Sequence, residues 1–136
     1  MSEAQKLNGK SIKHDISIPI EKIPLFLKKA KVYLSDFSKN NILTFGPLAE
    51  GTLHYNISKP KTMHKSVFNK LHKKVNSNIF NLVHDLGGSF SAEHGIGLIK
   101  KKEFKKYTSK EEFLIKYNLK KLLDPNNIMN PGKIFN

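Results

Sequence analysis

The chain has 136 residues, a formal net charge of +13 and no cysteine. This length fits one domain with a core of its own, and the missing cysteines exclude a disulfide framework and thiolate chemistry. No apolar run reaches the roughly 20 residues of a membrane span, and no secretory signal precedes Lys13. We therefore expect a cytoplasmic protein, at most peripheral to a membrane.

All 24 basic residues are lysine. Nucleic-acid readers commonly use arginine for bidentate contacts with bases and phosphates, so we expect no specific nucleic-acid partner. A coding bias toward A and T accounts for a chain rich in lysine, asparagine and isoleucine. The charge still attracts phosphates without sequence preference, so a lysine-rich anion-binding module is one alternative function.

Residues 11–18 alternate apolar and polar side chains and predict a half-buried strand that ends at Pro19. Helical spacing follows from about Ile20, with Pro24 in the first turn, where its missing N–H costs nothing. A turn is expected at residues 40–41. Residues 42–46 and 53–57 predict two further strands, and the short segment between them makes them a hairpin.

The longest helical pattern runs from Thr62 to Leu86, with Thr62 as the expected N-cap and Gly87 in the left-handed position after the helix. Residues 89–92 predict a short fourth strand. The order of elements predicts an α+β protein: a ferredoxin-like split β-α-β-β-α-β unit with an antiparallel sheet and both helices on one face.

A lysine-rich segment and a second helical pattern, residues 109–123, follow Gly97. Ser109 and Glu112 have the spacing of a capping box. We expect a flexible N-terminus at residues 1–10, a split βαβ core at residues 11–97, and a helical tail at residues 98–136 that contains the sequence Asn-Pro-Gly-Lys near its end.

Residues 87–97 combine two glycine turns with Glu93 and His94. An imidazole can accept a proton from a hydroxyl group while the attached carbon is oxidised, or it can simply bond to the loop backbone. Glu93 can bind a metal, orient a histidine or cap the next segment. His54 faces away from its strand neighbours Leu53 and Tyr55 and can meet Glu93.

Two ligands are too few for a zinc site, which needs four, or three with a water molecule. The remaining histidines have no metal-binding spacing, and we expect them at the solvated surface: His14, His64, His72 and His84. Neither a P-loop nor a dinucleotide-binding glycine motif is present. The residues alone therefore indicate a Glu-His site without a visible cofactor fold.

Two motifs nevertheless resemble a known family. Residues 89–97, Ser-Phe-Ser-Ala-Glu-His-Gly-Ile-Gly, with Lys100, and residues 123–133, Leu-Asp-Pro-Asn-Asn-Ile-Met-Asn-Pro-Gly-Lys, look like the C-terminal end of FAD-linked oxidases. This group contains D-lactate dehydrogenase, the glycolate oxidase D-subunit and D-2-hydroxyglutarate dehydrogenase. Residues 15–19 and 53–56 also look like family positions, so the resemblance covers nearly the whole chain.

The resemblance implies an FAD-dependent oxidation of a small 2-hydroxy acid under a cap domain. His94 matches the histidine that takes the hydroxyl proton, and Lys100 faces the substrate carboxylate. His54 and Glu93 match metal-binding positions. The Asn130–Lys133 end, with Asn130 and Gly132, packs near the flavin in the family.

The chain departs from the family twice. The hairpin pattern His-Leu-Gly-Asp-Gly-Asn-Leu-His is here Pro-Leu-Ala-Glu-Gly-Thr-Leu-His at residues 47–54, so Pro47 replaces one metal ligand and we expect weak or no zinc binding. The FAD-binding domain is also missing from these residues. The leading hypothesis is a truncated cap domain that is inactive alone and does not bind FAD by itself. The alternative is one subunit of a split enzyme whose FAD-binding domain is on a separate chain.

Overall fold

The computed structural model describes residues 10–35, 37 and 41–135. Residues 1–9 of the predicted flexible N-terminus (residues 1–10) and Asn40 of the predicted turn lie outside the described residues. The contacts divide the chain into two compact units, Met1–Glu93 and His94–Asn136. Each unit is described by itself below.

The first unit is built on a three-stranded antiparallel sheet in the order β1-β3-β2. The strands are β1 (Ser11–Ser17), β2 (Ile42–Phe45) and β3 (Thr52–Ser58). A short 3-10 turn, η3 (Leu48–Glu50), connects β2 to β3. The predicted hairpin is therefore present, and β3 forms the centre of the sheet.

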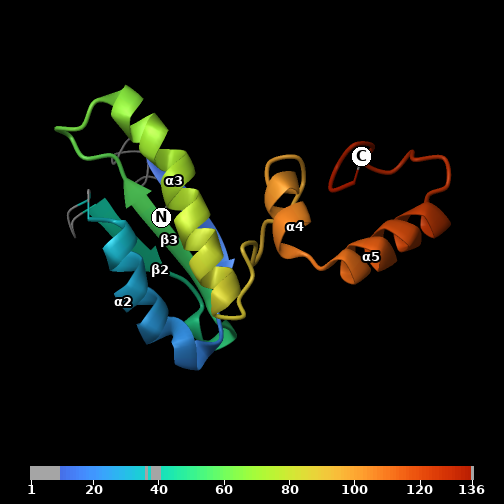
Figure 1. Cartoon of the computed structure of the whole chain (residues 1–136), viewed down its shortest axis with the longest axis horizontal. Coiled ribbons are helices and arrows are strands. Elements are labelled where there is room, and N and C mark those ends of the chain that lie inside the picture. The colour runs from blue at the N-terminus through green and yellow to red at the C-terminus, as the bar shows by residue number, and fades with distance from the viewer. Residues whose placement is uncertain (1–9, 36, 38–40, 136) are drawn as a thin grey trace. The chain divides into compact units, whose positions relative to one another are not determined.

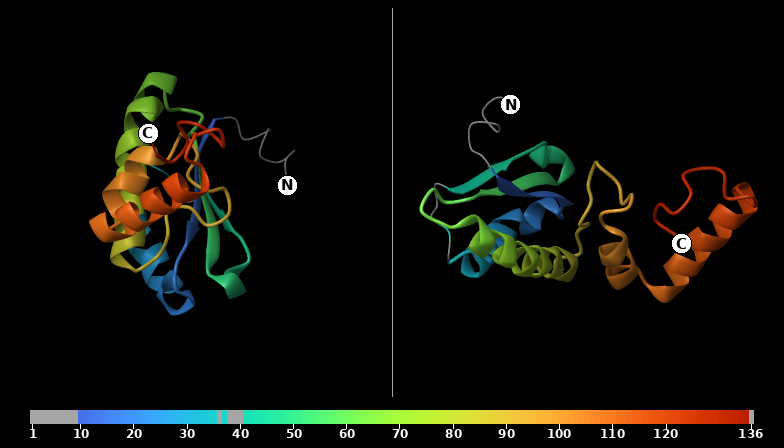
Figure 2. Two further views of the ribbon diagram at one scale, coloured as in Figure 1. Left: turned by 90° about the vertical axis from the view of Figure 1, so that its right-hand side faces the viewer. Right: turned by 90° about the horizontal axis from the view of Figure 1, so that it is seen from above.

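Two helices cover one face of this sheet (Figure 1 and, seen from above, Figure 2): α2 (Ile23–Tyr33), which follows the 3-10 turn η1 (Ile20–Lys22), and α3 (Lys65–Asp85). Their apolar stripes pack on alternate residues of the strands. The core residues from the strands and helices are almost fully buried: Ile12, Ile16, Phe26, Ala30, Leu53, Tyr55, Ile57, Phe68, Ile79 and Val83. The α+β split arrangement predicted from the sequence is thus confirmed.

The ends of α3 show one correct and one wrong prediction. Gly87 has φ +76° as expected, and the amides of Gly87 and Gly88 donate to the carbonyls of His84 and Val83, which completes a Schellman motif. The N-cap is His64, whose Nδ1 accepts from the Ser66 amide, and it is not Thr62. Lys59 Nζ donates to the carbonyls of Pro60 and Met63 in the turn that precedes the helix.

The predicted fourth strand is reduced to a single antiparallel bridge between Ser17 and Ser89. It lies beside β1, where the fourth strand of a split βαβ unit belongs. The Ser89 hydroxyl donates to the carbonyl of Ser91 and accepts from its amide, and this local turn diverts the chain from the sheet.

His14 corrects another expectation, because it is buried in the core and not solvated. It occupies the same strand face as Ile12 and Ile16, and its Nδ1 lies 2.9 Å from the Tyr55 carbonyl oxygen.

The second unit contains α4 (Lys101–Tyr107), in the segment that the sequence showed only as lysine-rich, and α5 (Lys110–Leu123). The Ser109 hydroxyl accepts from the Glu112 amide, as the capping box predicts. Four aromatic rings pack together with centroid distances of 5.5–5.9 Å between neighbours: Phe104, Phe113, Tyr117 and Phe135. Among the described residues, no helix combines the length and apolar character needed to cross a membrane.

Candidate functional site

The candidate site lies on the face of the sheet opposite to the helices. Asp15 of β1 is paired directly with His54 of β3. Their neighbours His14 and Tyr55 point to the helical side, so Asp15 and His54 point to the other side. Directly opposite residues of an antiparallel pair hold their side chains close together.

Glu93 reaches these residues through the loop that runs beside β1. The Ser17–Ser89 bridge fixes the start of the loop, and the Ala92 amide donates to the Asp15 carbonyl at 3.3 Å. The Glu93 amide donates to both carboxylate oxygens of Asp15, at 3.3 Å and 3.1 Å. Asp15 therefore positions the backbone from which the Glu93 side chain extends.

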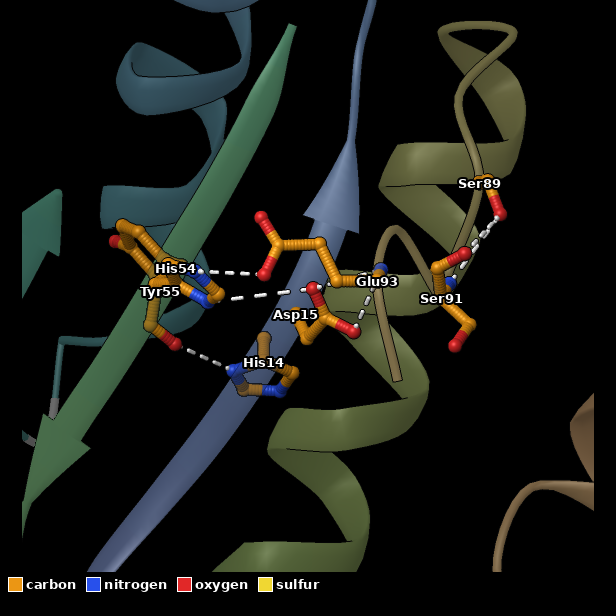
Figure 3. A network of polar contacts seen from close by, with 7 residues as sticks. All are labelled: His14, Asp15, His54, Tyr55, Ser89, Ser91 and Glu93. Carbon is orange, nitrogen blue, oxygen red and sulfur yellow. Dashed lines mark hydrogen bonds and ion pairs between the residues drawn. The ribbon is translucent and has the colours of Figure 1, made fainter. Parts of the chain in front are cut away.

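The three side chains point toward one another, as Figure 3 shows. His54 Nδ1 lies 4.0 Å from Asp15 Oδ1, and His54 Nε2 lies 3.7 Å from Glu93 Oε2. One donor atom from each of the three residues lies within 4.8 Å of the other two. The Phe45 ring packs beside the imidazole with a centroid distance of 5.1 Å and closes one side of the cluster.

This arrangement contains one imidazole and two carboxylates, which is a donor set suited to a divalent metal ion. His54 and Glu93 are brought together, as their predicted faces suggested. Asp15 was not among the residues selected from the sequence. The alternation in β1 does place Asp15 on the strand face opposite to Ile12 and Ile16. That Asp15 lies beside His54, however, depends on the register between β1 and β3.

Pro47 stands before η3 and carries no donor atom on its side chain. The position therefore contributes no metal ligand, as the sequence indicated. The third donor in this structure comes from β1, not from the hairpin.

The other predicted site residues belong to the second unit. His94 is its first residue and is exposed, while Lys100 is half-buried and precedes α4. Asn130 and Gly132 have positive φ values of 47° and 72°. They lie in the C-terminal motif, whose Gly132 carbonyl accepts from Lys101 Nζ at 2.9 Å.

The two sequence motifs meet within this second unit. The Ile134 amide donates to the Gly97 carbonyl at 3.0 Å, so the end of the C-terminal motif is held against the Gly95–Gly97 loop. Asp124 organises the start of the same motif by accepting from the amides of Ile128 and Met129 at 2.8 Å and 2.9 Å.

The described residues do not form a cradle for a dinucleotide cofactor. Such a cradle needs a glycine turn that follows a strand and opens a helix, so that the pyrophosphate meets the helix N-terminus. The Gly95–Gly97 turn follows a loop and leads into α4, a helix of only 7 residues. The described residues therefore offer FAD no glycine turn of this kind.

Comparison with known proteins identifies relatives over nearly the whole chain. The family model "FAD linked oxidases, C-terminal domain" matches residues 1–134. A D-2-hydroxyglutarate dehydrogenase of Stutzerimonas stutzeri is 40% identical over 124 residues, which are 90% of this chain and 27% of that protein. A probable mitochondrial D-2-hydroxyglutarate dehydrogenase of Oryza sativa subsp. japonica is 34% identical, over 98% of this chain and 23% of that protein.

A D-lactate dehydrogenase of Archaeoglobus fulgidus is 29% identical over 88% of this chain and 26% of that protein. The chain thus spans about a quarter of the length of the curated relatives that it matches. Since the family model covers both the sheet with its candidate site and the helical tail, the chain belongs to the family of the C-terminal domain of FAD-linked oxidases.

Proposed function

We propose that this chain is the substrate-side cap of an FAD-dependent D-2-hydroxy-acid dehydrogenase, acting on an acid of the D-2-hydroxyglutarate or D-lactate type. The main observation behind this proposal is the Asp15–His54–Glu93 cluster. Its last residue, Glu93, directly precedes His94 in the sequence. The relatives of the chain are named as dehydrogenases of these acids. A polar cluster on the sheet face opposite to the helices is suited to a small polar substrate.

The proposed roles follow from the chemistry of each side chain. His94 accepts the proton of the substrate hydroxyl, because a histidine side chain within reach of a hydroxyl can act as a general base. Lys100 pairs with the substrate carboxylate through its ammonium group. FAD, held by a different domain, supplies the acceptor for the two electrons. Asn130 and Gly132 belong to the segment that faces that domain.

We further propose that a separate polypeptide supplies the flavin-binding domain and that the chain is inactive alone. One observation supports this: the described residues form no dinucleotide cradle. The second unit also exposes many large apolar side chains that a partner domain could cover, among them Leu98, Ile99, Ile115, Leu122, Leu123 and Ile128.

The test compares the purified chain with the chain co-expressed with the product of the neighbouring reading frame. Alone, the chain should show no flavin absorbance and no dye reduction with D-2-hydroxyglutarate, D-lactate or glycolate. The co-expressed pair should co-purify, contain FAD and reduce the dye. Turnover by the chain alone would contradict the proposed dependence, and failure of the two proteins to form a complex would contradict the split enzyme.

Within the active pair, His94→Gln should lower kcat by about 10²–10⁴-fold, the usual contribution of a general base. His84→Gln is the matched control, because His84 is an exposed residue of α3 outside the cluster. Equal activity of both variants would remove His94 from the proposed chemistry.

A further inference from the structure

A cavity lies on the helical side of the sheet, and the proposed roles leave it unused. Its volume is about 440 Å³, which is within the range of small-molecule sites. Strands β2 and β3 form one wall, and α2 with the residues that follow it forms the other. The described lining residues all belong to the first unit: Leu27, Lys31, Leu34, Ser35, Phe37, Ile42, Thr44 and Tyr55.

The cavity opens where the helices leave β2 uncovered. Thr44 of β2 is paired directly with Tyr55 of β3, so both side chains point to the helical side of the sheet. Tyr55 is nevertheless only 2% exposed, whereas Thr44 is exposed. The helical layer therefore encloses the centre of the sheet and leaves a hollow over its β2 edge.

Tyr55 is the most buried polar residue of the lining. Its ring meets Phe26 of α2 edge-on at a centroid distance of 5.3 Å, and no described residue bonds to its hydroxyl. Burial raises the pKa of Tyr55 to about 12, so the hydroxyl keeps its proton at neutral pH. A buried hydroxyl without a protein partner is costly unless water or a ligand bonds to it. The cavity thus contains a hydrogen-bond donor that a ligand can satisfy.

The other lining residues define the chemistry of that ligand. Lys31 supplies a positive charge, and Ser35 and Thr44 supply two further hydroxyl groups. None of these three side chains bonds to another described residue. Donors and a cation favour an anionic group on the ligand. The rest of the lining is apolar and favours an apolar body: Leu27, Leu34, Phe37 and Ile42.

We propose that this cavity binds a small monocarboxylate with an apolar or aromatic body. Its carboxylate accepts from the Tyr55 hydroxyl, and Lys31 supplies the counter-charge. Its body packs between α2 and the exposed side of β2. The cavity and the Asp15–His54–Glu93 cluster lie on opposite faces of the sheet. Binding is therefore a property of the first unit and does not depend on the proposed function.

The first experiment titrates the ¹⁵N-labelled full chain with 3-phenylpropionate at pH 7 and follows the amide resonances by NMR. Amides of the lining residues should shift saturably, with a Kd of about 1 mM or below for a ligand of this size. The uncharged 3-phenylpropionamide should bind about tenfold more weakly, because it lacks the charge-assisted contacts. Absence of saturable shifts, or equal affinity for the amide, would overturn the proposal.

The second experiment tests the two polar contacts. Tyr55→Phe keeps the ring and removes the hydroxyl, and Lys31→Gln removes the charge, so each should weaken binding about fivefold or more. Lys29→Gln is the matched control, because Lys29 is an exposed lysine on the opposite face of the same helix. It should bind as the wild type does. Unchanged affinity of either Tyr55→Phe or Lys31→Gln would overturn the assigned contacts.

A measurement on the wild type decides the case if a variant fails to fold. Intermolecular nuclear Overhauser effects should connect the phenyl protons of the ligand to the methyl groups of Leu27, Leu34 and Ile42. Leu119 and Leu123 line a different apolar hollow, which lies in the second unit. Contacts of the ligand with these two residues in place of the first three would overturn the assignment.

Discussion

His14 and Asp15 are adjacent in the sequence, yet they serve opposite faces of the same strand. His14 is enclosed by the helices, where its ring meets Phe80 edge-on at 5.4 Å. Asp15 turns to the polar face and holds the Glu93 loop. The same burial on the helical side raises the pKa of Tyr55 to about 12. A shift of register by one residue would exchange these environments.

Asp124 has a comparable organising role in the second unit. Its carboxylate accepts from Lys120 and from the amides of Ile128 and Met129, and Lys120 also donates to the Met129 carbonyl at 2.6 Å. These contacts fold the chain back after α5. The hydrogen bond from Lys120 first, and then those from the two amides, lower the pKa of Asp124 below its ordinary value of 3.8.

We expect Asp124→Asn to lower the Tm of the chain at pH 7, because an amide accepts these bonds more weakly than a carboxylate does. The folded state lowers the pKa of this acid, so its stabilisation is present above the ordinary value of 3.8 and is lost as pH falls through the lower folded-state pKa. The difference in Tm between wild type and variant should therefore shrink in strong acid.

Circular dichroism melts at neutral and acidic pH measure both effects, with Glu111→Gln as the control, since Glu111 is an exposed acid in the first turn of α5. A difference in Tm that is the same at every pH would contradict the assigned role of Asp124.

The elements with long and regular apolar spacing were predictable from the sequence. Apolar residues at spacings of three and four predicted α3, and the alternation of apolar and polar residues predicted β1. The capping box of Ser109 and Glu112 predicted the start of α5. The fourth strand was not predictable as a single bridge, because the Ser89–Ser91 turn competes with the sheet for the same backbone groups. α4 has only 7 residues, too few for a periodic pattern to show.

The junction between α3 and the site loop tolerates no side chain at Gly88. A Cβ there would lie 2.2 Å from the Ser17 carbonyl oxygen and 3.0 Å from Val83 Cγ1. At Gly87 the nearest atom to an added Cβ is Lys22 Nζ at 3.9 Å, so only the left-handed backbone opposes a side chain. The two glycines therefore differ in the kind of restraint they meet.

We expect Gly88→Ala to lower the free energy of unfolding by about 3 kcal/mol through overpacking, and Gly87→Ala by about 1 kcal/mol through left-handed strain. Urea titration of both variants measures the difference. An equal or smaller loss for Gly88→Ala would contradict the close approach of the strand.

On the scale of the whole molecule, only part of the candidate site could be predicted from the sequence. His54 and Glu93 were selected through motifs, whereas Asp15 becomes a candidate only once β1 and β3 are paired in register. The contact between the Gly95–Gly97 loop and Ile134 likewise joins residues far apart in the chain. Periodicity reports local structure, and it carries no information about which distant segments pair.

The division of the chain at Glu93 and His94 places the whole Asp15–His54–Glu93 cluster in the first unit. A fragment of residues 1–97 should therefore fold cooperatively, because it contains the sheet and both helices that cover it. Ending the fragment at Gly97 keeps its terminal carboxylate away from Glu93. Urea titrations of the fragment, followed by circular dichroism and by tyrosine fluorescence, test this. Two transitions at different urea concentrations, or no transition at all, would contradict independent folding of the first unit.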